Sequence, residues 1–204
     1  DVYKRQLTTN FAEAGGFIKS DPSEPAPDLQ LHFVIGKLVD HGRKTVFGHG
    51  YSAHVCLLQP KSRGAVTLTS RDPMALPLVD PNFLADPDDM ARMGRGFKRT
   101  REILMQPALA KFGAKELAAS ASARTDAEIE QFIRQYADTI YHPVGTCRMG
   151  PGPMDVVDAE LRVHGLAGLR VVDASIMPRI VSGNTNAPTV MIAEKAVDLL
   201  RAAP

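Results

Sequence analysis

The stretch LQLHFV, residues 29–34, alternates apolar and polar side chains with a period of two. This alternation predicts a half-buried β-strand, because successive side chains of a strand point to opposite faces of the sheet. Further along the chain, HVCLLQP (54–60) and AVTLTS (65–70) predict two more strands, which the turn PKSRG joins. SDPSEPAPD (20–28), just before the first strand, is typical of a proline-rich loop. We therefore expect an antiparallel sheet.

Two helices are predicted after these strands, and each has its own start signal. Asp86 is a suitable cap for a helix over residues 87–106, with Pro87 at its first position. The segment TDAE (125–128) is a capping box that predicts a second helix, ending at about Ala137. The first helix carries an apolar stripe that we expect to pack in the core: Met90, Met93, Phe97, Ile103 and Leu104.

The remaining stretches complete the expected architecture. DPMALPLVDPNFLADPDD (72–89) is rich in Asp-Pro steps and is expected to hold no regular element. LRVVDAS (169–175) predicts a buried strand that ends in an aspartate, and NAPTVMIAEKAVDLLRAA (186–203) predicts a closing helix with Asn186 near the cap and Pro188 in the first turn. These elements predict an α+β fold in which an antiparallel sheet is flanked by helices.

Composition excludes several classes of function. The chain has 204 residues, of which 44% are hydrophobic and 23% charged, and its net charge of +1 gives no reason to expect a nucleic-acid partner. No apolar run approaches the roughly 20 residues of a membrane-spanning helix. The two cysteines argue against a disulfide framework. Three histidines close in sequence lack zinc-like companions, so we expect no metal site: His41, His49 and His54. GHGYSA (48–53) matches a loose dinucleotide fingerprint. A strand is predicted after it rather than a helix, so no helix N-terminus is available for a pyrophosphate and we interpret the match as false.

Two motifs could carry chemistry. In YHPVGTCRMG (141–150), Pro143 forces the preceding His142 into an extended conformation and Gly145 permits a sharp reversal. A fixed imidazole suits proton transfer, although a histidine that merely hydrogen-bonds in a loop is the favoured interpretation of this decapeptide alone. In SGNTNAPT (182–189), two asparagines lie at the positive end of the predicted closing helix, where negative charge could develop. Helix capping alone would explain one asparagine but not both.

Together these blocks resemble a known family. YHPVGTCRMG, VVDAELRVHGLAGLRVVDASIMP (156–178) and SGNTNAPTVMIAEKAVDLL (182–200), in this order and spacing, are similar to the C-terminal signature of the glucose-methanol-choline (GMC) oxidoreductases, which oxidise alcohols with FAD. The similarity continues upstream through DLQLHF, KSRGAVTL, DPNFLADPDD and REILMQPAL, and it covers essentially the whole chain after residue 6. The three C-terminal blocks are specific only in combination.

The resemblance implies roles for individual residues. His142 matches the family histidine that takes the proton of the alcohol hydroxyl beside the flavin. Its partner, histidine or asparagine in the family, lies eleven positions after Asp173, at Asn184, with Asn186 as the second candidate. Asp173 and Ala174 match positions near the FAD phosphate and ribitol, and the backbone of Thr185 and Asn186 matches the part that meets the flavin pyrimidine edge. Three further residues match positions that line the substrate cavity: Glu13, His32 and Ile140.

The resemblance also implies a function and its alternatives. We expect an FAD-dependent dehydrogenase that oxidises primary alcohols to aldehydes and passes the electrons to a quinone or another non-oxygen acceptor. Choline dehydrogenase is the alternative within the family, because an acid at Glu13 can pair with the substrate ammonium in choline-type members. An inactive binding or structural module is the alternative from another class. We expect a cytoplasmic protein. If the electron acceptor is a quinone, we expect peripheral contact with the inner face of a membrane.

The expected domain organisation follows from the same comparison. Asp1–Gln6 is interpreted as a sequencing or cloning scar, residues 7–139 as a substrate-binding domain, and residues 140–204 as a segment that completes an FAD domain. The dinucleotide fingerprint of the family lies N-terminal to the matched region. We therefore expect these 204 residues alone to bind FAD weakly or not at all, to expose apolar faces and to be poorly soluble without the N-terminal FAD domain.

Overall fold

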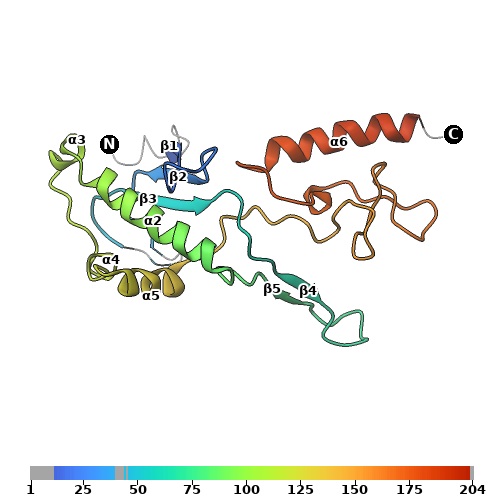
Figure 1. Cartoon of the computed structure of the whole chain (residues 1–204), viewed down its shortest axis with the longest axis horizontal. Coiled ribbons are helices and arrows are strands. Elements are labelled where there is room, and N and C mark those ends of the chain that lie inside the picture. Colours follow the sequence, from blue (N-terminus) through green and yellow to red (C-terminus); the bar gives the residue numbers. More distant parts are fainter. Residues whose placement is uncertain (1–11, 40–43, 45, 203–204) are drawn as a thin grey trace. The chain divides into compact units, whose positions relative to one another are not determined.

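The computed structural model describes residues 12–39, 44 and 46–202 (Figure 1). Asp1–Gln6, interpreted above as a scar, lie outside the described residues. The chain divides into two compact units. Of the described residues, the first unit contains those up to Ser62 together with Leu84–Asp138, and the second contains Arg63–Phe83 and residues 139–202. The segment Arg63–Phe83 thus groups with the C-terminal part of the chain, a division that the expected domain boundaries did not include.

A three-stranded antiparallel sheet forms the basis of the first unit. Its strands are β1 (Ala12–Ile18), β2 (Leu29–Val34) and β3 (Ser52–Leu57), in the order β1-β2-β3. The predicted strand 29–34 is confirmed as the central one. In the register of the sheet, His32 stands opposite Gly15 on β1 and His54 on β3. The register of β1 shifts between Ala12 and Ala14, which places Glu13 at a β-bulge.

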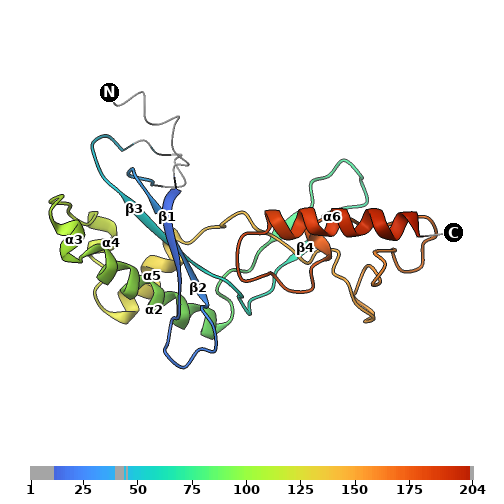
Figure 2. The same cartoon turned by 90° about the horizontal axis from the view of Figure 1, so that it is seen from above.

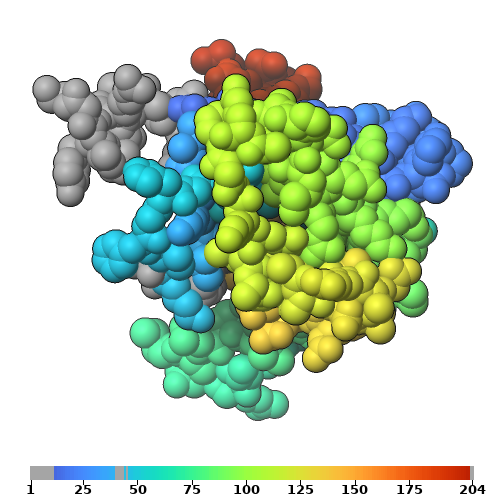
Figure 3. Space-filling model, turned by 90° about the vertical axis from the view of Figure 1, so that its left-hand side faces the viewer, coloured from blue at the N-terminus to red at the C-terminus, as the bar shows by residue number. Residues whose placement is uncertain are grey.

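The helices of this unit begin where the sequence predicts. Helix α2 (Pro87–Leu104) is capped by Asp86, whose carboxylate accepts a hydrogen bond from the Asp88 amide at 2.9 Å. Helix α5 (Asp126–Tyr136) begins with the capping box formed by Thr125 and Glu128. Two helices of a single turn lie between them, α3 (Pro107–Ala110) and α4 (Ala118–Ala121). In Figure 3 the segment from α2 to α5, green to yellow, covers the centre of the unit's visible face.

Helix α2 packs against strand β3 of the sheet and against α5. In Figure 2 it lies beside the three strands. A Cβ atom added at Gly96 would stand 3.0 Å from a side-chain atom of Leu29 and 3.1 Å from one of Val55, so the glycine lets α2 lie this close to the sheet without displacing either side chain. The opposite side of α2 packs on α5 around a buried cluster: Met90, Ala123, Ile129 and Ile133. Burial of one such aliphatic side chain stabilises the fold by about 1.5–3 kcal/mol.

Two members of the predicted apolar stripe, Ile103 and the half-buried Leu104, are not part of this cluster. Ile103 is 37% exposed, whereas Met93 and Phe97 pack against the buried cluster. Residues that recur three or four positions apart share one face of a helix. Ile103 lies six positions after Phe97 and falls off that face, so the prediction of core packing was wrong for Ile103. For Leu104, at the end of α2, packing in this cluster is not confirmed.

The second unit contains few regular elements. Strands β4 (Ala65–Thr67) and β5 (Leu78–Asp80) form a two-stranded antiparallel sheet, η2 (Ala174–Ile176) is a single turn of 3₁₀-helix, and α6 (Asn186–Arg201) is the closing helix. The core of this unit forms between the 157–177 segment and α6. Its buried members are Val157, Leu161, Ile176, Met177, Ile192 and Ala196.

Three sequence predictions about strands were wrong. The strands around the PKSRG turn do not pair with each other, because β3 pairs with β2 while β4 pairs with β5. The Asp-Pro stretch contains a regular element after all, the short strand β5 between Pro77 and Pro81. The segment 169–175 is neither a ladder strand nor buried. It contributes the isolated bridge at Arg170 and then enters η2, because Asp173 caps that turn with its own side chain.

Helix α6 confirms the predicted closing helix but leaves much of its apolar surface uncovered. Four of its apolar residues are 41–59% exposed: Val190, Met191, Val197 and Leu200. The expectation of an exposed apolar face on this helix therefore holds for the chain described here. Among the described residues, no helix combines the length and the apolar character needed to cross a bilayer.

Candidate active site

The loop that carries His142 is held in a strained and well-anchored conformation. Tyr141, immediately before the histidine, has a positive φ of 64°, which is uncommon for an aromatic residue, and Gly145 has a φ of 88°. The loop is tied to the segment around η2 by two backbone hydrogen bonds, from the Cys147 amide to the Ser175 carbonyl at 3.0 Å and from the Met149 amide to the Ile176 carbonyl at 2.8 Å. Strain of this kind persists where the surrounding structure enforces it, and it clusters at functional sites.

Both ring nitrogens of His142 have a partner from the segment that begins α6. The Nδ2 amide of Asn184 lies 2.8 Å from His142 Nε2, and the hydroxyl of Thr185 lies 2.9 Å from His142 Nδ1. The imidazole is half-buried, Thr185 is buried at 8% exposure and Asn184 is exposed. Residues 42 and 43 positions apart in the chain thus meet at one ring.

The orientation of the Asn184 amide in this structure fits one tautomer of the neutral ring. An amide nitrogen can only donate, so His142 Nε2 accepts the hydrogen bond from Asn184. The ring proton must then sit on Nδ1, which donates to the Thr185 hydroxyl. The Nε2 lone pair is the basic position of the ring, and an amide donor stands directly beside it. This arrangement can accept a proton at His142 Nε2 and stabilise a neighbouring negative oxygen through a hydrogen bond from the Asn184 amide.

The structure distinguishes between the two candidate asparagines. Asn184 contacts His142, whereas Asn186 is the first residue of α6 and is exposed. The cap position itself belongs to Thr185, whose side chain makes no capping bond to the helix. Sequence analysis assigned only the backbone of Thr185 to the site. A threonine at a helix cap is expected to cap, so nothing in the sequence indicated that its hydroxyl would turn to the histidine.

The start of α6 offers donors that fit an electron-rich cofactor edge. The first amides of a helix have no intrahelical acceptors, and the helix dipole adds about half a positive charge at this end. The side chain of Thr185 leaves these amides uncapped, and His142 and Asn184 lie next to them. The donor set therefore fits the pyrimidine edge of a flavin, which gains negative charge on reduction.

The other residues matched to FAD have local roles in this structure. Asp173 is exposed, and its carboxylate accepts a hydrogen bond from the Ser175 amide at 2.7 Å, which caps η2. Ala174 is half-buried in the same turn. A carboxylate that is already used as a cap, and that carries the same charge as a phosphate, contributes no phosphate-binding donor of its own. Their assignment to the cofactor stays a prediction based on the resemblance.

The residues matched to the substrate cavity are divided between the units. Glu13 is exposed on β1 and His32 is half-buried on β2, both in the first unit. Ile140, which is 37% exposed, belongs to the second unit and lies two residues before His142. The His32 ring lies 4.0 Å from the Cys56 sulfur. Burial raises the pKa of the Cys56 thiol, so this sulfur stays protonated near neutral pH and supplies no nucleophile.

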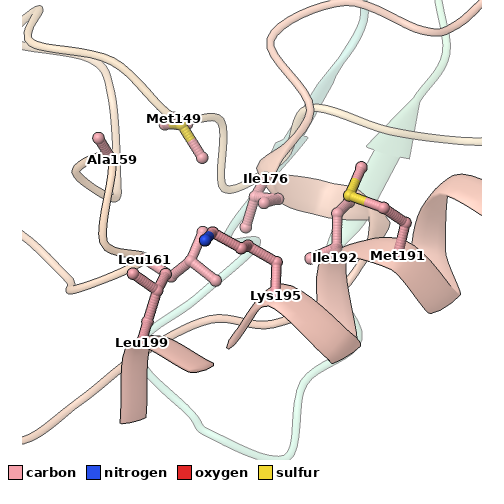
Figure 4. Close-up of a pocket in the computed structure, with 8 residues that line it drawn as sticks. All are labelled: Met149, Ala159, Leu161, Ile176, Met191, Ile192, Lys195 and Leu199. Carbon is pink, nitrogen blue, oxygen red and sulfur yellow. The ribbon is translucent and has the colours of Figure 1, made fainter. Parts of the chain in front are cut away.

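An apolar pocket in the second unit is separate from this site. It lies between α6 and the loops that face it, and it is lined by Met149, Ala159, Leu161, Ile176, Met191, Ile192, Lys195 and Leu199 (Figure 4). Neither His142 nor Asn184 contributes to it. Lys195 supplies the charged group among these side chains. The pocket has no pair of groups suited to proton transfer, so the His142–Asn184 pair remains the candidate for chemistry.

Comparisons with known proteins point in the same direction. A sequence model of the family described as GMC oxidoreductase matches residues 60–193. The chain is 52% identical over 201 residues to an alcohol dehydrogenase [acceptor] of Pseudomonas putida, covering 98% of this chain and 36% of that protein. It is 48% identical over 193 residues to an oxygen-dependent choline dehydrogenase of Paraburkholderia xenovorans, covering 95% of this chain and 34% of that protein. The chain thus spans about a third of the length of the curated relatives it matches.

Solved structures with the same fold support this relationship. The crystal structure of pyridoxine 4-oxidase from Mesorbium loti superposes with a TM-score of 0.82 at 29% identity, over 95% of this chain and 38% of that one. A fungal aryl-alcohol oxidase superposes with a TM-score of 0.71 at 31% identity, over 86% of this chain and 28% of that one. Both names describe enzymes that oxidise a small organic molecule.

Proposed function

The chain belongs to the GMC oxidoreductase family, and from this premise we propose that the protein oxidises primary alcohols to aldehydes with FAD as its cofactor. The observation that carries the proposal is the contact between Asn184 Nδ2 and His142 Nε2 at 2.8 Å. It brings a proton acceptor and a neutral hydrogen-bond donor to one point, as alcohol oxidation requires.

His142 acts on the hydroxyl proton. An alcohol that enters beside the ring donates its O–H to Nε2, whose lone pair Asn184 occupies in the structure described here. The O–H bond breaks, an Nε2–H bond forms, and the ring becomes an imidazolium that keeps its Nδ1–H on Thr185. Asn184 then donates to the alcohol oxygen as this atom gains negative charge, in the manner of an oxyanion-hole donor.

The oxidation also removes a hydride from the alcohol carbon, and this hydride needs an acceptor that no side chain provides. No amino-acid side chain accepts a hydride, and FAD, when bound, supplies that acceptor. Residues Thr185, Asn186 and the first turn of α6 would hold its pyrimidine edge with uncapped amides. The aldehyde leaves after the carbon has lost its hydride and the oxygen has lost its proton.

The substrate class and the electron acceptor extend the proposal beyond this chain. We assign primary aliphatic alcohols and a quinone or another non-oxygen acceptor, because the relative that is 52% identical is named an alcohol dehydrogenase with an acceptor. The test measures anaerobic bleaching of the flavin by 1-octanol in the natural protein that contains this chain. We expect bleaching in the wild type and a loss of at least a hundredfold in rate in His142→Gln. Equal rates in the two proteins would overturn the proposal.

Choline is the second candidate substrate, and two observations favour it. Oxygen-dependent choline dehydrogenases are among the relatives, at 48% identity in one case. Glu13 is exposed at a β-bulge, and a bulge changes the direction in which a side chain points. The exposed carboxylate of Glu13 can therefore pair with a cation. The comparison of kcat/KM for choline and 1-octanol decides between the candidates. A higher value for choline, lowered by Glu13→Gln while the value for octanol is retained, would identify choline as the substrate.

A further inference from the structure

The residue before His142 has a backbone conformation that its own side chain does not explain. Tyr141 has a φ of 64°, in the left-handed region, where a bulky residue is an outlier. Glycine and asparagine adopt this region at little cost, so a tyrosine there needs a compensating interaction. The ring of Tyr141 is 63% exposed, so burial of the ring compensates little of the cost. The main chain of Tyr141 is the other place where such an interaction can act.

A hydroxyl two residues earlier supplies an interaction of this kind. The Tyr141 amide donates a hydrogen bond to Thr139 Oγ1 at 2.9 Å. A threonine that accepts from the amide two positions later stabilises a local turn of the backbone. Thr139 is half-buried. Because the donor belongs to the peptide group between residues 140 and 141, this hydrogen bond fixes the direction in which that N–H points.

The direction of this N–H and the φ of Tyr141 are coupled. A planar peptide group can rotate between its two Cα atoms, and the rotation changes ψ of the residue before it and φ of the residue after it together. Reversal of the 140–141 peptide would point its N–H away from Thr139 and move φ of Tyr141 out of the left-handed region. The Thr139 hydroxyl therefore stabilises the strained orientation against the relaxed one.

The chain after Tyr141 is anchored independently of Thr139. Backbone hydrogen bonds tie the loop to the carbonyls of residues 175 and 176, and the His142 ring lies within hydrogen-bond distance of two side chains at the start of α6. Tyr141 joins this anchored loop to the peptide group that Thr139 holds. Strain persists where the surrounding structure enforces it, and here it lies directly beside the candidate base.

We propose that Thr139 is a positioning residue that holds the 140–141 peptide in the orientation from which the His142 ring reaches its two partners. This inference rests on the proposed function, because the position of the ring affects a rate only if the ring takes a proton. Thr139 acts through the backbone and takes no part in the proton transfer itself. Its loss gives the loop a second conformation, and a displacement of about 1 Å is enough to slow a reaction strongly. The effect should appear in kcat more than in KM.

The test compares variants of the natural, flavin-loaded protein that contains this chain. Thr139→Val removes the acceptor and keeps the branched shape, and Thr139→Ser keeps the acceptor. Tyr141→Asn supplies a residue that adopts the left-handed region readily. In the Tyr141→Asn background the peptide keeps its orientation without help from the hydroxyl, so the double variant Thr139→Val/Tyr141→Asn separates positioning from a merely structural role. If Thr139→Val does not fold, Thr139→Ala takes its place.

The first readout is the rate of anaerobic flavin reduction at saturating 1-octanol. We expect Thr139→Val to lower this rate about tenfold, the size expected for one lost hydrogen bond, and Thr139→Ser to keep it within about threefold. In the Tyr141→Asn background, Thr139→Val should lower the rate by less than about threefold. A merely structural role for the hydroxyl predicts the same loss in both backgrounds, and equal losses would overturn the proposal.

The second readout is independent of activity. Crystal structures of the variants should show a negative φ at Tyr141 and a reversed 140–141 peptide in Thr139→Val. Residue 141 should keep its positive φ in Thr139→Ser and in the double variant, because the first retains the acceptor and the second removes the strain. A φ that stays positive in Thr139→Val would overturn the role of Thr139.

The two proposals fail in distinguishable ways. A positive φ in Thr139→Val would overturn the positioning role even if the protein oxidises alcohols. The expected reversal of the peptide, in a protein whose flavin reduction by alcohols does not depend on His142, would overturn the proposed function instead.

Discussion

Replacement of Asn184 by alanine provides a direct test of the candidate site. The substitution removes the amide that donates to His142 Nε2 at 2.8 Å and leaves the backbone and the helix start in place. In the proposed reaction, the same amide moves its hydrogen bond to the oxygen that loses its proton. Asn184→Ala should therefore slow the chemical step and leave the fold of the chain intact.

The size of the effect follows from the position of the donor. Removal of one oxyanion-type donor lowers the rate by about 10²–10³ in enzymes. Asn184 is exposed in the chain described here, which favours the lower end. We therefore expect a loss of about a hundredfold, equivalent to about 2.7 kcal/mol of transition-state stabilisation. Asn184→Asp should lose more, because a carboxylate cannot donate and would hold a proton on the Nε2 atom that must receive one.

The assay is the anaerobic rate of flavin reduction by 1-octanol under single-turnover conditions, which does not depend on the identity of the electron acceptor. Asn186→Ala is the comparison. This variant keeps the backbone amide of residue 186, and it removes a side chain other than that of Asn184, which contacts the imidazole. We expect it to lose less than tenfold. A loss in Asn186→Ala as large as in Asn184→Ala would refute the assignment of the partner, and wild-type rates in both would refute the donor role itself.

Three further predictions concern stability and are measured by urea unfolding of the natural protein that contains this chain. Ile129→Ala, at a side chain with 2% exposure between α2 and α5, should cost about 2–5 kcal/mol, whereas the exposed Gln131→Ala on the same helix should stay within about 0.5 kcal/mol; equal effects would contradict the described core. Gly145→Ala should destabilise by about 1–2 kcal/mol, because φ is 88° and a Cβ would lie 3.3 Å from the Met177 carbonyl oxygen, whereas Gly94→Ala, in the middle of α2 with open space around it, should stabilise by about 0.5–1 kcal/mol. Hydrogen bonds from the Thr125 and Arg124 amides lower the pKa of Glu128 below its ordinary value of 4.5. The contribution of Glu128 to stability is therefore complete above pH 4.5 and is lost as the pH falls through the lowered pKa. Glu128→Gln should be less stable than the wild type at pH 7, and a difference in unfolding free energy that persists on acidification would count against the capping box as its cause.

Local signals accounted for the helices and for the central strand. Asp86 with Pro87, and Thr125 with Glu128, satisfy amides that belong to their own helix turns, so residues within four positions of each other decide where α2 and α5 begin. The period of two in residues 29–34 predicted β2 with its observed bounds. Pairing was not predictable in the same way. The partner of β4 is β5, a strand framed by prolines in a stretch where no strand was expected.

The amino-acid sequence by itself determined which groups could do chemistry: an imidazole fixed by Pro143, and two carboxamides at a helix start. These properties arise from bonds and steric limits within a few residues. Only the tertiary structure decided that Asn184, and not Asn186, reaches the ring, and that the Thr185 hydroxyl faces Nδ1 instead of capping α6. Those choices depend on how the 141–149 loop is tied to the segment around η2, more than 25 residues later in the chain. Contacts at such separations are set by packing and by non-local hydrogen bonds, which no local sequence pattern encodes.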